Sequence, residues 1–328
     1  MSSSQLDVLC VGESMLMVTP ERPGELTLGP GYALHVAGAE SNVAIHLAAL
    51  GCRAAWASRV GAGPLGDLLV SAIDAAGVDV SLVERSPTHP TGVFFKVPRA
   101  DGSSVHYYRR GSAAATMGPA FADRVRRSAA TVTHLTGITA ALSPSCLELL
   151  RALLARPRPR GRWVSFDVNY RPALWERDAA PVLLELARQA DVVFVGLDEA
   201  GALWRVRTVD ELASLLPPTC VLVVKNAAED ATTVRGGRRT SVPARQVEVV
   251  DPVGAGDAFA AGWLAGALRG LPDEARLKLG HFVASTVLGT VADVAPLPPV
   301  EHICDAIGVS TAEWSAATAN VAGAAPCP

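Results

Sequence analysis

The chain has 328 residues, of which 49% are hydrophobic and 19% are charged, and its formal net charge is −3. This length and apolar content favour a globular protein of one large α/β domain or two ordinary ones. The lack of a basic field argues against nucleic acid as a partner, and no apolar run reaches the ~18 residues that a membrane span needs. Because residues 1–5 also lack the features of a targeting segment, we expect a cytoplasmic protein with no membrane partner.

Cysteine and histidine spacing gives no sign of a metal site. The 6 cysteines are scattered singly without a C-x-x-C pair, and the 7 histidines show no spacing typical of metal ligands. We therefore expect reduced, mostly buried thiols and no structural metal.

The N-terminal segments alternate between strand and helix patterns. Asp7–Gly12 is a continuous apolar run ending in glycine, which is typical of a strand buried on both faces, and we expect it to be a central strand of a parallel sheet. Residues 13–36 are broken by prolines and glycines, and we assign them to a small β-rich lid. A helix is predicted over 38–51, followed by a strand over 53–61 and a helix over 66–76.

A second β-rich segment, residues 90–110, completes the predicted lid. Two strand-like pieces flank Ala100-Asp101-Gly102, a good hairpin turn, and they pair naturally with the earlier segment. His106–Arg109 is unusual for a surface hairpin: its side chains are either strand aromatics beside a solvated arginine or part of a binding surface. Since an exposed β edge is best buried, the lid also suggests a homodimer or higher homo-oligomer.

Polar residues follow a predicted strand in the middle of the chain. A helix over 147–154 and a turn over 156–160, whose arginines we expect to be solvated, precede the apolar run 163–166. That run leads into Asn169 and Arg171. Because open α/β sheets bind ligands at the carboxyl ends of their parallel strands, Asn169 and Arg171 are candidate site residues.

The C-terminal half continues the alternation of β and α units. The remaining predicted elements are apolar strands over 191–195 and 220–225, a helix over 208–216, a polar turn over 235–240, the end of a strand over 247–250, and a helix of small residues over 281–291. The fold class predicted is α/β, with a central, mostly parallel sheet flanked by helices in three layers. We assign 1–310 to a single domain that carries the lid, and 311–328 to an alanine-rich tail.

Glycine, a carboxylate and a helix start are crowded in the stretch Asp251–Trp263, which reads DPVGAGDAFAAGW. The apolar residues in and after it keep helical spacing, so the glycine turn is expected to open into a helix N-terminus. The N–H groups of Gly254, Ala255 and Gly256 would then point at an anion, helped by the helix dipole. Asp257 beside such a site is either an N-cap or a proton acceptor.

The same stretch resembles the C-terminal signature of the ribokinase-like (PfkB) carbohydrate kinases, and AGAESNVAIHLAALG, from Ala37, resembles their N-terminal signature. The resemblance implies that Asp257 is the general base and that Gly254, Ala255 and Gly256 form the anion hole. It also implies that Gly38 and Asn42 contact sugar hydroxyls. Asn42 as a helix-start amide bonded to local backbone is the alternative reading.

Two further phrases, YYRRGSAAA from Tyr107 and FDVNYRPALW from Phe166, resemble segments of the 2-keto-3-deoxygluconate kinases. The resemblance implies that Tyr107, Arg109 and Arg171 contact a carboxylated sugar. Both arginines as solvated surface charges are the alternative. The competing functions are a neutral-sugar kinase of fructokinase or ribokinase type, a 5-keto-2-deoxygluconate kinase, a nucleoside kinase, and a sugar-acid-binding paralogue with impaired transfer.

The nucleotide side departs further from the family pattern. Glu199 survives from an Asn-x-x-Glu motif in which Gly196 replaces the asparagine, and the loop from Lys225 to Asp230 lacks the usual glycines. The resemblance implies that ATP, with bound Mg2+, contacts Lys225, Glu199 and the helix that contains Ser285. It also implies a potassium-like cation near Asp251 and Val253.

Overall fold

The computed structural model describes residues 6–21, 26–29, 31–99 and 102–318. The predicted hairpin tip at Ala100 and Asp101, the lead-in 1–5 and the tail beyond residue 318 lie outside the described ranges. No helix within these ranges is both long enough and apolar enough to cross a membrane.

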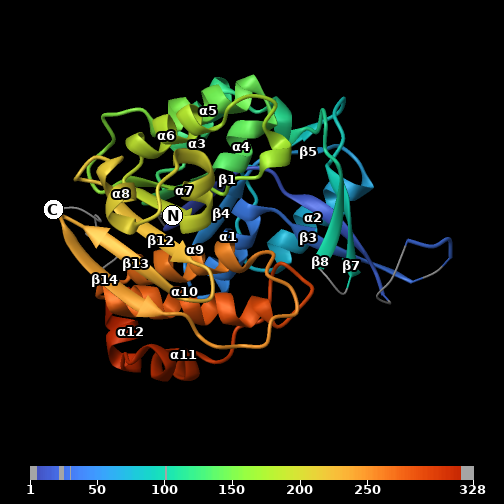
Figure 1. Ribbon diagram of the computed structural model, residues 1–328. Helices are drawn as coiled ribbons and strands as arrows, with labels where there is room; N and C mark the ends of the chain where they lie inside the picture. The colour runs from blue at the N-terminus through green and yellow to red at the C-terminus, as the bar shows by residue number, and fades with distance from the viewer. Residues whose placement is uncertain (1–5, 22–25, 30, 100–101, 319–328) are drawn as a thin grey trace, which may run out of the picture.

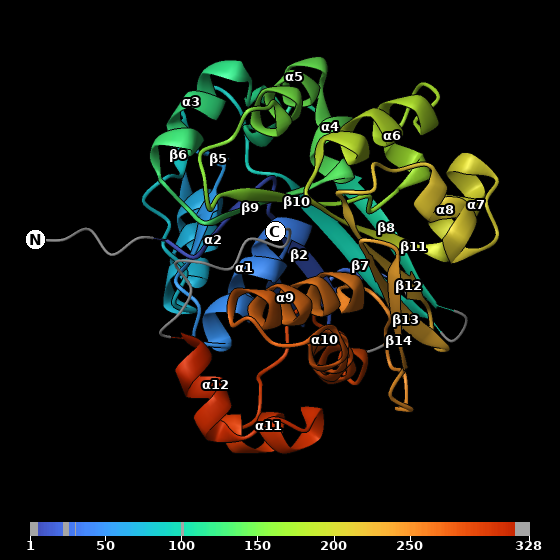
Figure 2. The same ribbon diagram turned by 90° about the vertical axis from the view of Figure 1, so that its left-hand side faces the viewer.

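Eight strands form the large sheet in the order β14-β13-β12-β11-β10-β9-β1-β4 (Figures 1 and 2). Their bounds are β1 Val8–Val11, β4 Ala54–Ala57, β9 Val132–Thr136, β10 Trp163–Asp167, β11 Val192–Gly196, β12 Val221–Asn226, β13 Asp230–Arg235 and β14 Arg238–Pro243. The strands from β4 to β12 are parallel, whereas β13 pairs antiparallel with both of its neighbours, β12 and β14. The chain passes from β1 to β4 on one side and then from β9 outward on the other. The order therefore reverses between β1 and β9, which is where open α/β sheets bind ligands.

Helices cover both faces of the large sheet, as Figure 2 shows. One face packs against α1 Ala39–Ala49, α2 Pro64–Ala75, α9 Ala255–Leu268, α10 Asp273–Leu288, α11 Val300–Ile307 and α12 Thr311–Thr318. The other packs against α3 Pro119–Arg127, α4 Gly137–Leu142, α5 Pro144–Leu154, α6 Ala180–Gln189, α7 Leu197–Trp204 and α8 Val209–Ser214. Two short 3-10 helices, η1 and η2, span Ala114–Thr116 and Pro172–Leu174.

Alternation within the buried strands builds these two cores. In β1, Val8 and Cys10 face the core beneath α1 and α9, while Leu9 and Val11 face the opposite core. A strand with apolar side chains on both faces must be covered on both sides. The sheet therefore lies in the middle layer of three, which confirms the predicted fold class.

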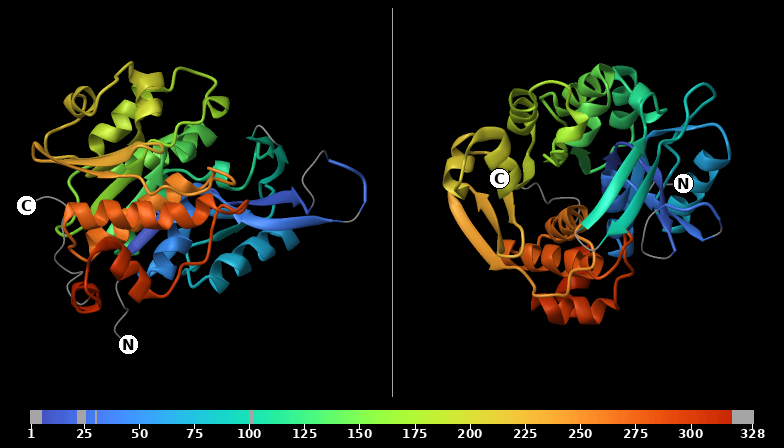
Figure 3. Two further views of the ribbon diagram at one scale, coloured as in Figure 1. Left: turned by 60° about the horizontal axis from the view of Figure 1, so that its bottom comes forward. Right: turned by 45° about the vertical axis from the view of Figure 1, so that its right-hand side comes forward.

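A separate small sheet, of order β3-β2-β7-β8, stands out from this body (Figures 1 and 3). Its strands are β2 Met15–Pro20, β3 Tyr32–Ala37, β7 Val93–Arg99 and β8 Gly102–Tyr108. The two segments predicted to form a lid thus join in one sheet, because β2 pairs with β7. Met15, Met17, Ala37 and Phe94 form its small core. A short pair, β5 Arg59–Gly61 and β6 Glu84–Ser86, is separate from both sheets.

Several expected elements were wrong. β1 is buried but lies next to the edge strand β4, not at the centre of the sheet. The strand expected over 53–61 is split between β4 and β5. The polar turn expected over 235–240 belongs to the β13–β14 hairpin, and 247–250 form no strand. Helix α7, between β11 and α8, was missed altogether.

The arginine turn at 156–160 is less solvated than expected. Arg158 is largely buried, and its Nη1 donates to Asp191 Oδ2 at 2.9 Å. Its Nη2 donates to the carbonyl groups of Leu154 and Gln189. Arg158 therefore ties the end of α5 to the segment between α6 and β11 and has a structural role.

Candidate active site

The start of α9 has the geometry of an anion site. Gly254 is the N-cap with φ 84°, and a Cβ there would lie 2.6 Å from the carbonyl oxygen of Asp293, so only glycine fits. The amides of Gly254 and Gly256 have no acceptor among the described residues, whereas that of Ala255 donates to the Pro252 carbonyl at 3.3 Å. Two of the three predicted anion-hole amides are therefore unengaged, and the third closes the turn.

Asp257, in the first turn of α9, is buried and is not a helix cap. Its Oδ2 accepts a hydrogen bond from Asn42 Nδ2 at 2.9 Å, and its Oδ1 accepts one from Asn169 Nδ2 at 3.2 Å. Burial, together with the charge of Asp167, raises the pKa of Asp257 to about 7, against the lowering effect of the Asn42 hydrogen bond. A carboxylate with such a pKa is suited to accept a proton near neutral pH.

The two asparagines come from different elements and each has an unused acceptor. Asn42 lies in the first turn of α1, and Asn169 follows β10 with a left-handed φ of 38°. Such a conformation is uncommon outside glycine and concentrates at functional sites. The Oδ1 atoms of both side chains are buried without a partner among the described residues. Each is available to accept a hydrogen bond from a ligand hydroxyl.

Gly38, the N-cap of α1, is required by close packing. A Cβ at this position would lie 2.4 Å from the carbonyl oxygen of Glu13. The Gly38 carbonyl accepts the amide of Asn42 at 2.8 Å. Gly38 thus brings the segment after β1 against the start of α1 and orients Asn42.

Lys225 places a positive charge at the start of α9. Its Nζ donates to Asp167 Oδ2 at 2.8 Å, and a Cβ on Gly256 would lie 3.4 Å from that Nζ. Lys225 is the last residue of β12 that pairs with the parallel strand β11, and Asp167 is the last residue of β10. The ammonium group therefore lies beside the unengaged amide of Gly256, where a phosphate oxygen would be favoured.

Glu199 braces the loop that carries Asn169 and Arg171. Its two carboxylate oxygens accept the amides of Tyr170 and Gly196, each at 2.7 Å. Burial raises the pKa of Glu199. Arg171 Nη1 lies 3.8 Å from Glu199 Oε1, and the arginine side chain is half exposed. Arg171 thus keeps donors free for a ligand, while Glu199 acts mainly as a support.

Arg109, by contrast, is committed to a carboxylate. Its Nε donates to Glu13 Oε2 at 2.7 Å, and Ser112 Oγ also donates to Glu13. The guanidinium group lies over the ring of Tyr107 at 5.6 Å from the centroid. The exposed ring of Tyr107 and the largely buried Arg109 therefore form one unit held against the end of β1.

Of the remaining predicted residues, Asp251 and Val253 lie in the turn that leads to the anion site, and Ser285 lies on another helix. Asp251 Oδ1 accepts the amide of Val253 at 2.9 Å, which closes the turn before the anion site. Ser285, on α10, donates to the Phe282 carbonyl of its own helix at 2.6 Å. Among the described residues, Ser285 forms no hydrogen bond with Asp257.

The sequence interpretation missed three charged residues that the fold brings to this region. They are Glu13, Lys96 and Asp167. Glu13 and Asp167 stand at the carboxyl ends of β1 and β10, a position that signals a ligand site in parallel sheets. Lys96 is a charge flanked on both sides by apolar residues of β7, a pattern that also signals a buried role.

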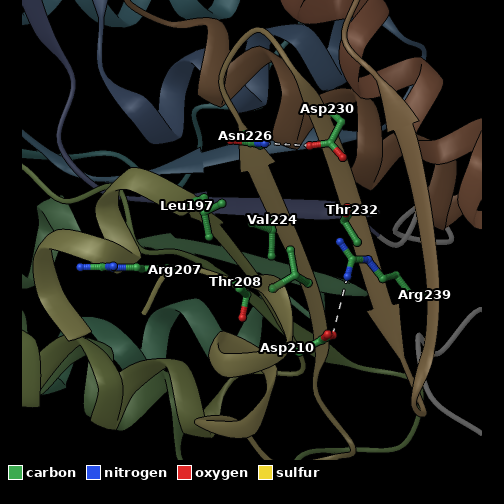
Figure 4. A pocket seen from close by; sticks show the side chains of 10 residues that line it. Leu197, Arg207, Thr208, Asp210, Val224, Asn226, Asp230, Thr232 and Arg239 are labelled. Carbon is green, nitrogen blue, oxygen red and sulfur yellow. Dashed lines mark hydrogen bonds and ion pairs between the residues drawn. The ribbon is translucent and has the colours of Figure 1, made fainter. Parts of the chain in front are cut away.

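A cavity of about 300 Å³ lies elsewhere, between α8 and the strands β12 to β14 (Figure 4). Its wall includes Asp210, Arg239 and Thr232, and the only ion pair drawn across it joins Arg239 to Asp210 at 3.7 Å. It lies on the sheet face covered by α7 and α8, away from α9. None of the predicted site residues lines it.

Comparisons with known proteins match most of the length of this chain. A sequence model of the pfkB family of carbohydrate kinases matches residues 5–299. The 2-dehydro-3-deoxygluconokinase of Bacillus subtilis is 35% identical, over 91% of this chain and 94% of that protein. The enzyme of the same name from Thermoproteus tenax is 33% identical, over 90% and 93%. The crystal structure of a PfkB protein from Polaromonas superposes with a TM-score of 0.79 at 36% identity, over 88% of this chain and 98% of that one.

Proposed function

Since the chain belongs to the pfkB family of carbohydrate kinases, we propose that it transfers the γ-phosphoryl group of ATP to a hydroxyl of 2-keto-3-deoxygluconate. That sugar acid, also called 2-dehydro-3-deoxygluconate, is named in both relatives described above. The chain is thus a phosphotransferase that acts on a sugar hydroxyl, and the sugar acid is its proposed substrate.

One observation carries the proposed chemistry: the carboxylate of Asp257 lies buried between Asn42 and Asn169 at the start of α9. In the proposed reaction, Asp257 takes the proton of the sugar hydroxyl while the hydroxyl oxygen forms a bond to the γ-phosphorus. The bond from that phosphorus to the bridging oxygen breaks, and ADP leaves with the electron pair. The amides of Gly254 and Gly256 stabilise the charge on the transferred group.

ATP enters this scheme as its magnesium complex, which offsets phosphate charge during transfer. Lys225, beside Gly256, supplies a further positive charge from the protein. For the adenine ring of ATP, the exposed side chains of Val249, Val250 and Val253 provide an apolar surface. This surface lies next to the end of α10, because the Val250 amide donates to the Leu288 carbonyl. Ser285 lies about one turn earlier on the same helix.

Recognition of a sugar acid needs positive charge close to Asp257. Arg171 lies two residues after Asn169, which donates a hydrogen bond to Asp257, and its positive charge lowers the pKa of Asp257. Because Arg171 is only loosely paired with Glu199, its planar fork can hold both oxygens of a substrate carboxylate. Arg109, neutralised by Glu13, contributes through its remaining N–H groups and through Tyr107.

The test is a coupled assay of ADP release, with 2-keto-3-deoxygluconate, 5-keto-2-deoxygluconate, fructose and ribose as acceptors. We expect the first to give the highest kcat/KM. Arg171→Ala should lower kcat/KM for the acid by about 10- to 150-fold, the value of one charge-assisted contact, and affect neutral sugars far less. Arg177→Ala, an exposed arginine nearby, is the matched control and should change neither.

Two results would overturn the substrate assignment. One is a higher kcat/KM for fructose or ribose than for any keto-deoxy acid, which would favour the neutral-sugar alternative. The other is an equal effect of Arg171→Ala on acid and neutral acceptors.

We also propose that the small sheet mediates a homodimer. Its outer strands β3 and β8 expose the apolar side chains of Leu34 and Tyr108, which are 51% and 68% exposed. Unpaired strand edges of this kind are commonly covered by another chain. Sedimentation of the wild-type protein and of Leu34→Lys/Tyr108→Lys checks this, since the variant should sediment as a smaller species.

A further inference from the structure

A buried ammonium group lies beneath the anion site. Lys96 projects from β7 of the small sheet, and its side chain is only 1% exposed. Its Nζ lies 2.9 Å from Asp251 Oδ2, 3.2 Å from Asp293 Oδ1 and 3.1 Å from the Val291 carbonyl oxygen. An ammonium group has three N–H donors, so these three acceptors satisfy it fully.

The three acceptors belong to the two segments that shape the anion site. Asp251 begins the turn that leads to Gly254, and Asp293 packs its backbone directly on Gly254. The segment that contains Val291 and Asp293, in dark orange in Figure 1, follows α10 and lies beside β7 and β8. Ser103, on β8, also donates to Asp251 Oδ2 at 3.1 Å. The small sheet thus contacts the anion-site turn through a strand pair.

Charge and size both favour a lysine here. Asp251 and Asp293 are two buried carboxylates that need a compensating cation close by. Only Lys96, Lys225 and Lys278 among the 29 basic residues of the chain are lysines, and the first two both contact buried aspartates of the site region. An ammonium group is a compact point charge that fits a small oxygen cage, which a planar guanidinium would not.

We propose that the Lys96 ammonium takes the place of an inorganic monovalent cation and holds the anion-site turn in its working geometry. The inference rests on the proposed kinase function and makes Lys96 a positioning residue. The potassium-like ion expected near Asp251 and Val253 does not fit, because Asp251 Oδ1 is engaged by the Val253 amide and Oδ2 by Lys96. The cation is instead the side chain of Lys96, which the small sheet supplies.

The first arm of the test uses the wild-type protein. Turnover is measured with tetramethylammonium, which is too large for the cage, as the only monovalent cation, and then with Na+, K+ or NH4+ added. We expect no stimulation by any of the three. A saturable rise of kcat with K+ or NH4+ would show that an inorganic ion occupies the site, and the proposal would fail.

The second arm removes the charge. Lys96→Met keeps much of the side-chain volume, and we expect kcat to fall by about 10- to 100-fold in tetramethylammonium, as for a small displacement of catalytic groups, with KM less affected. K+ or NH4+ should restore part of the loss. For Lys96→Ala, propylammonium, which replaces the deleted Cγ, Cδ, Cε and Nζ atoms, should restore more than K+. Lys278→Met, at an exposed pair with Glu274, is the matched control and should show no cation dependence.

A third arm is independent of activity and so of the proposed substrate. The Tm of Lys96→Met should rise saturably with K+ but not with tetramethylammonium, while wild-type Tm should not respond in this way. If Lys96→Met does not fold in tetramethylammonium, the double variant Lys96→Met/Asp293→Asn, which buries one carboxylate fewer, is used instead. Loss of activity and Tm that no cation restores, or no loss at all, would overturn the proposal. A cation-dependent Tm with no sugar-acid turnover would overturn only the proposed function.

Discussion

At the scale of single residues, Asp257 depends on its neighbours for a working pKa. Burial and the charge of Asp167 raise the pKa, and the Asn42 hydrogen bond lowers it, so that the value is about 7. A general base works best with a pKa close to the operating pH. Asn42 therefore has two roles, as a contact for a hydroxyl and as a regulator of the base.

Asn42→Leu tests the second role. The change removes a donor that favours the ionised carboxylate, so the pKa of Asp257 should rise above its present value. Because the base must be ionised to act, the acidic limb of the profile of kcat/KM against pH should move to higher pH. Loss of substrate contact alone would lower kcat/KM at every pH without moving the limb. A limb that stays in place or moves to lower pH would contradict the role given to Asn42.

The identities of the central residues could be predicted from the sequence, but their contacts could not. Gly254, Asp257, Asn42 and Asn169 each stood out through a helix start or a strand end. Asn42 and Asp257 are 215 positions apart, and only the fold shows that they share a hydrogen bond. Lys96 was missed because its partner Asp293 is 197 positions away and no local pattern announces such a pairing.

At the scale of elements, the β12–β13 hairpin carries backbone strain. Ala227, where the resemblance leads us to expect glycine, has φ 45°. A residue with a Cβ pays ~1–2 kcal/mol for this conformation, and glycine does not. The turn therefore has a left-handed conformation at Ala227, although glycine is the residue that adopts this conformation without strain.

Ala227→Gly should raise the free energy of unfolding by up to about 1 kcal/mol, after allowing for the greater flexibility of glycine in the unfolded chain. Ala228→Gly is the matched control. This exposed neighbour has a negative φ, so its change should lower stability by ~0.4–1 kcal/mol. Urea unfolding of both variants at one pH checks the pair. Equal destabilisation by the two changes would contradict the strain at Ala227.

The hairpin β13–β14 shows why some elements escaped prediction. The polar residues of 235–240 suggested a loop, but Gly236 and Gly237 have φ values of 54° and 78° and form a tight turn between two strands. A Gly-Gly pair between two strands favours a hairpin turn, but the polar residues around it led us to expect a loop. Conversely, the valines of 247–250 resemble a strand, yet no described strand pairs with them. Apolar alternation alone does not supply a pairing partner.

At the scale of the whole molecule, the fold class followed from the sequence, but the strand order did not. A doubly buried strand shows the same pattern at the centre of a sheet and beside its edge, which is why β1 was misplaced. The reversal of strand order between β1 and β9 brings the segments after β1 and β10, the start of α1 and the start of α9 to one region. The proposed base and the anion site come from the start of α9, and the asparagine contacts come from the start of α1 and the segment after β10. The segment after β1 supplies Glu13, which holds Arg109 of the small sheet.

The small sheet is fastened to that region by charge. Arg109 binds Glu13 at the end of β1, and Lys96 binds Asp251 and Asp293 beside the start of α9. Buried ion pairs of this kind are strongly directional and costly to break. These ion pairs therefore fix the position of the substrate contacts on the small sheet relative to the anion site beside the large sheet.

The measurement that tests the account most directly is turnover of Asp257→Asn, with substrate binding measured on the same protein by calorimetry. Asparagine keeps the shape and one acceptor oxygen, so it retains one of the two hydrogen bonds that Asn42 and Asn169 donate, but it cannot take a proton at neutral pH. We predict that kcat for 2-keto-3-deoxygluconate falls at least ~10²-fold, the usual value of a general base, while the Kd of the sugar acid is nearly unchanged. A variant that binds the acid and keeps wild-type turnover would show that Asp257 is not the base, and the central claim would fail.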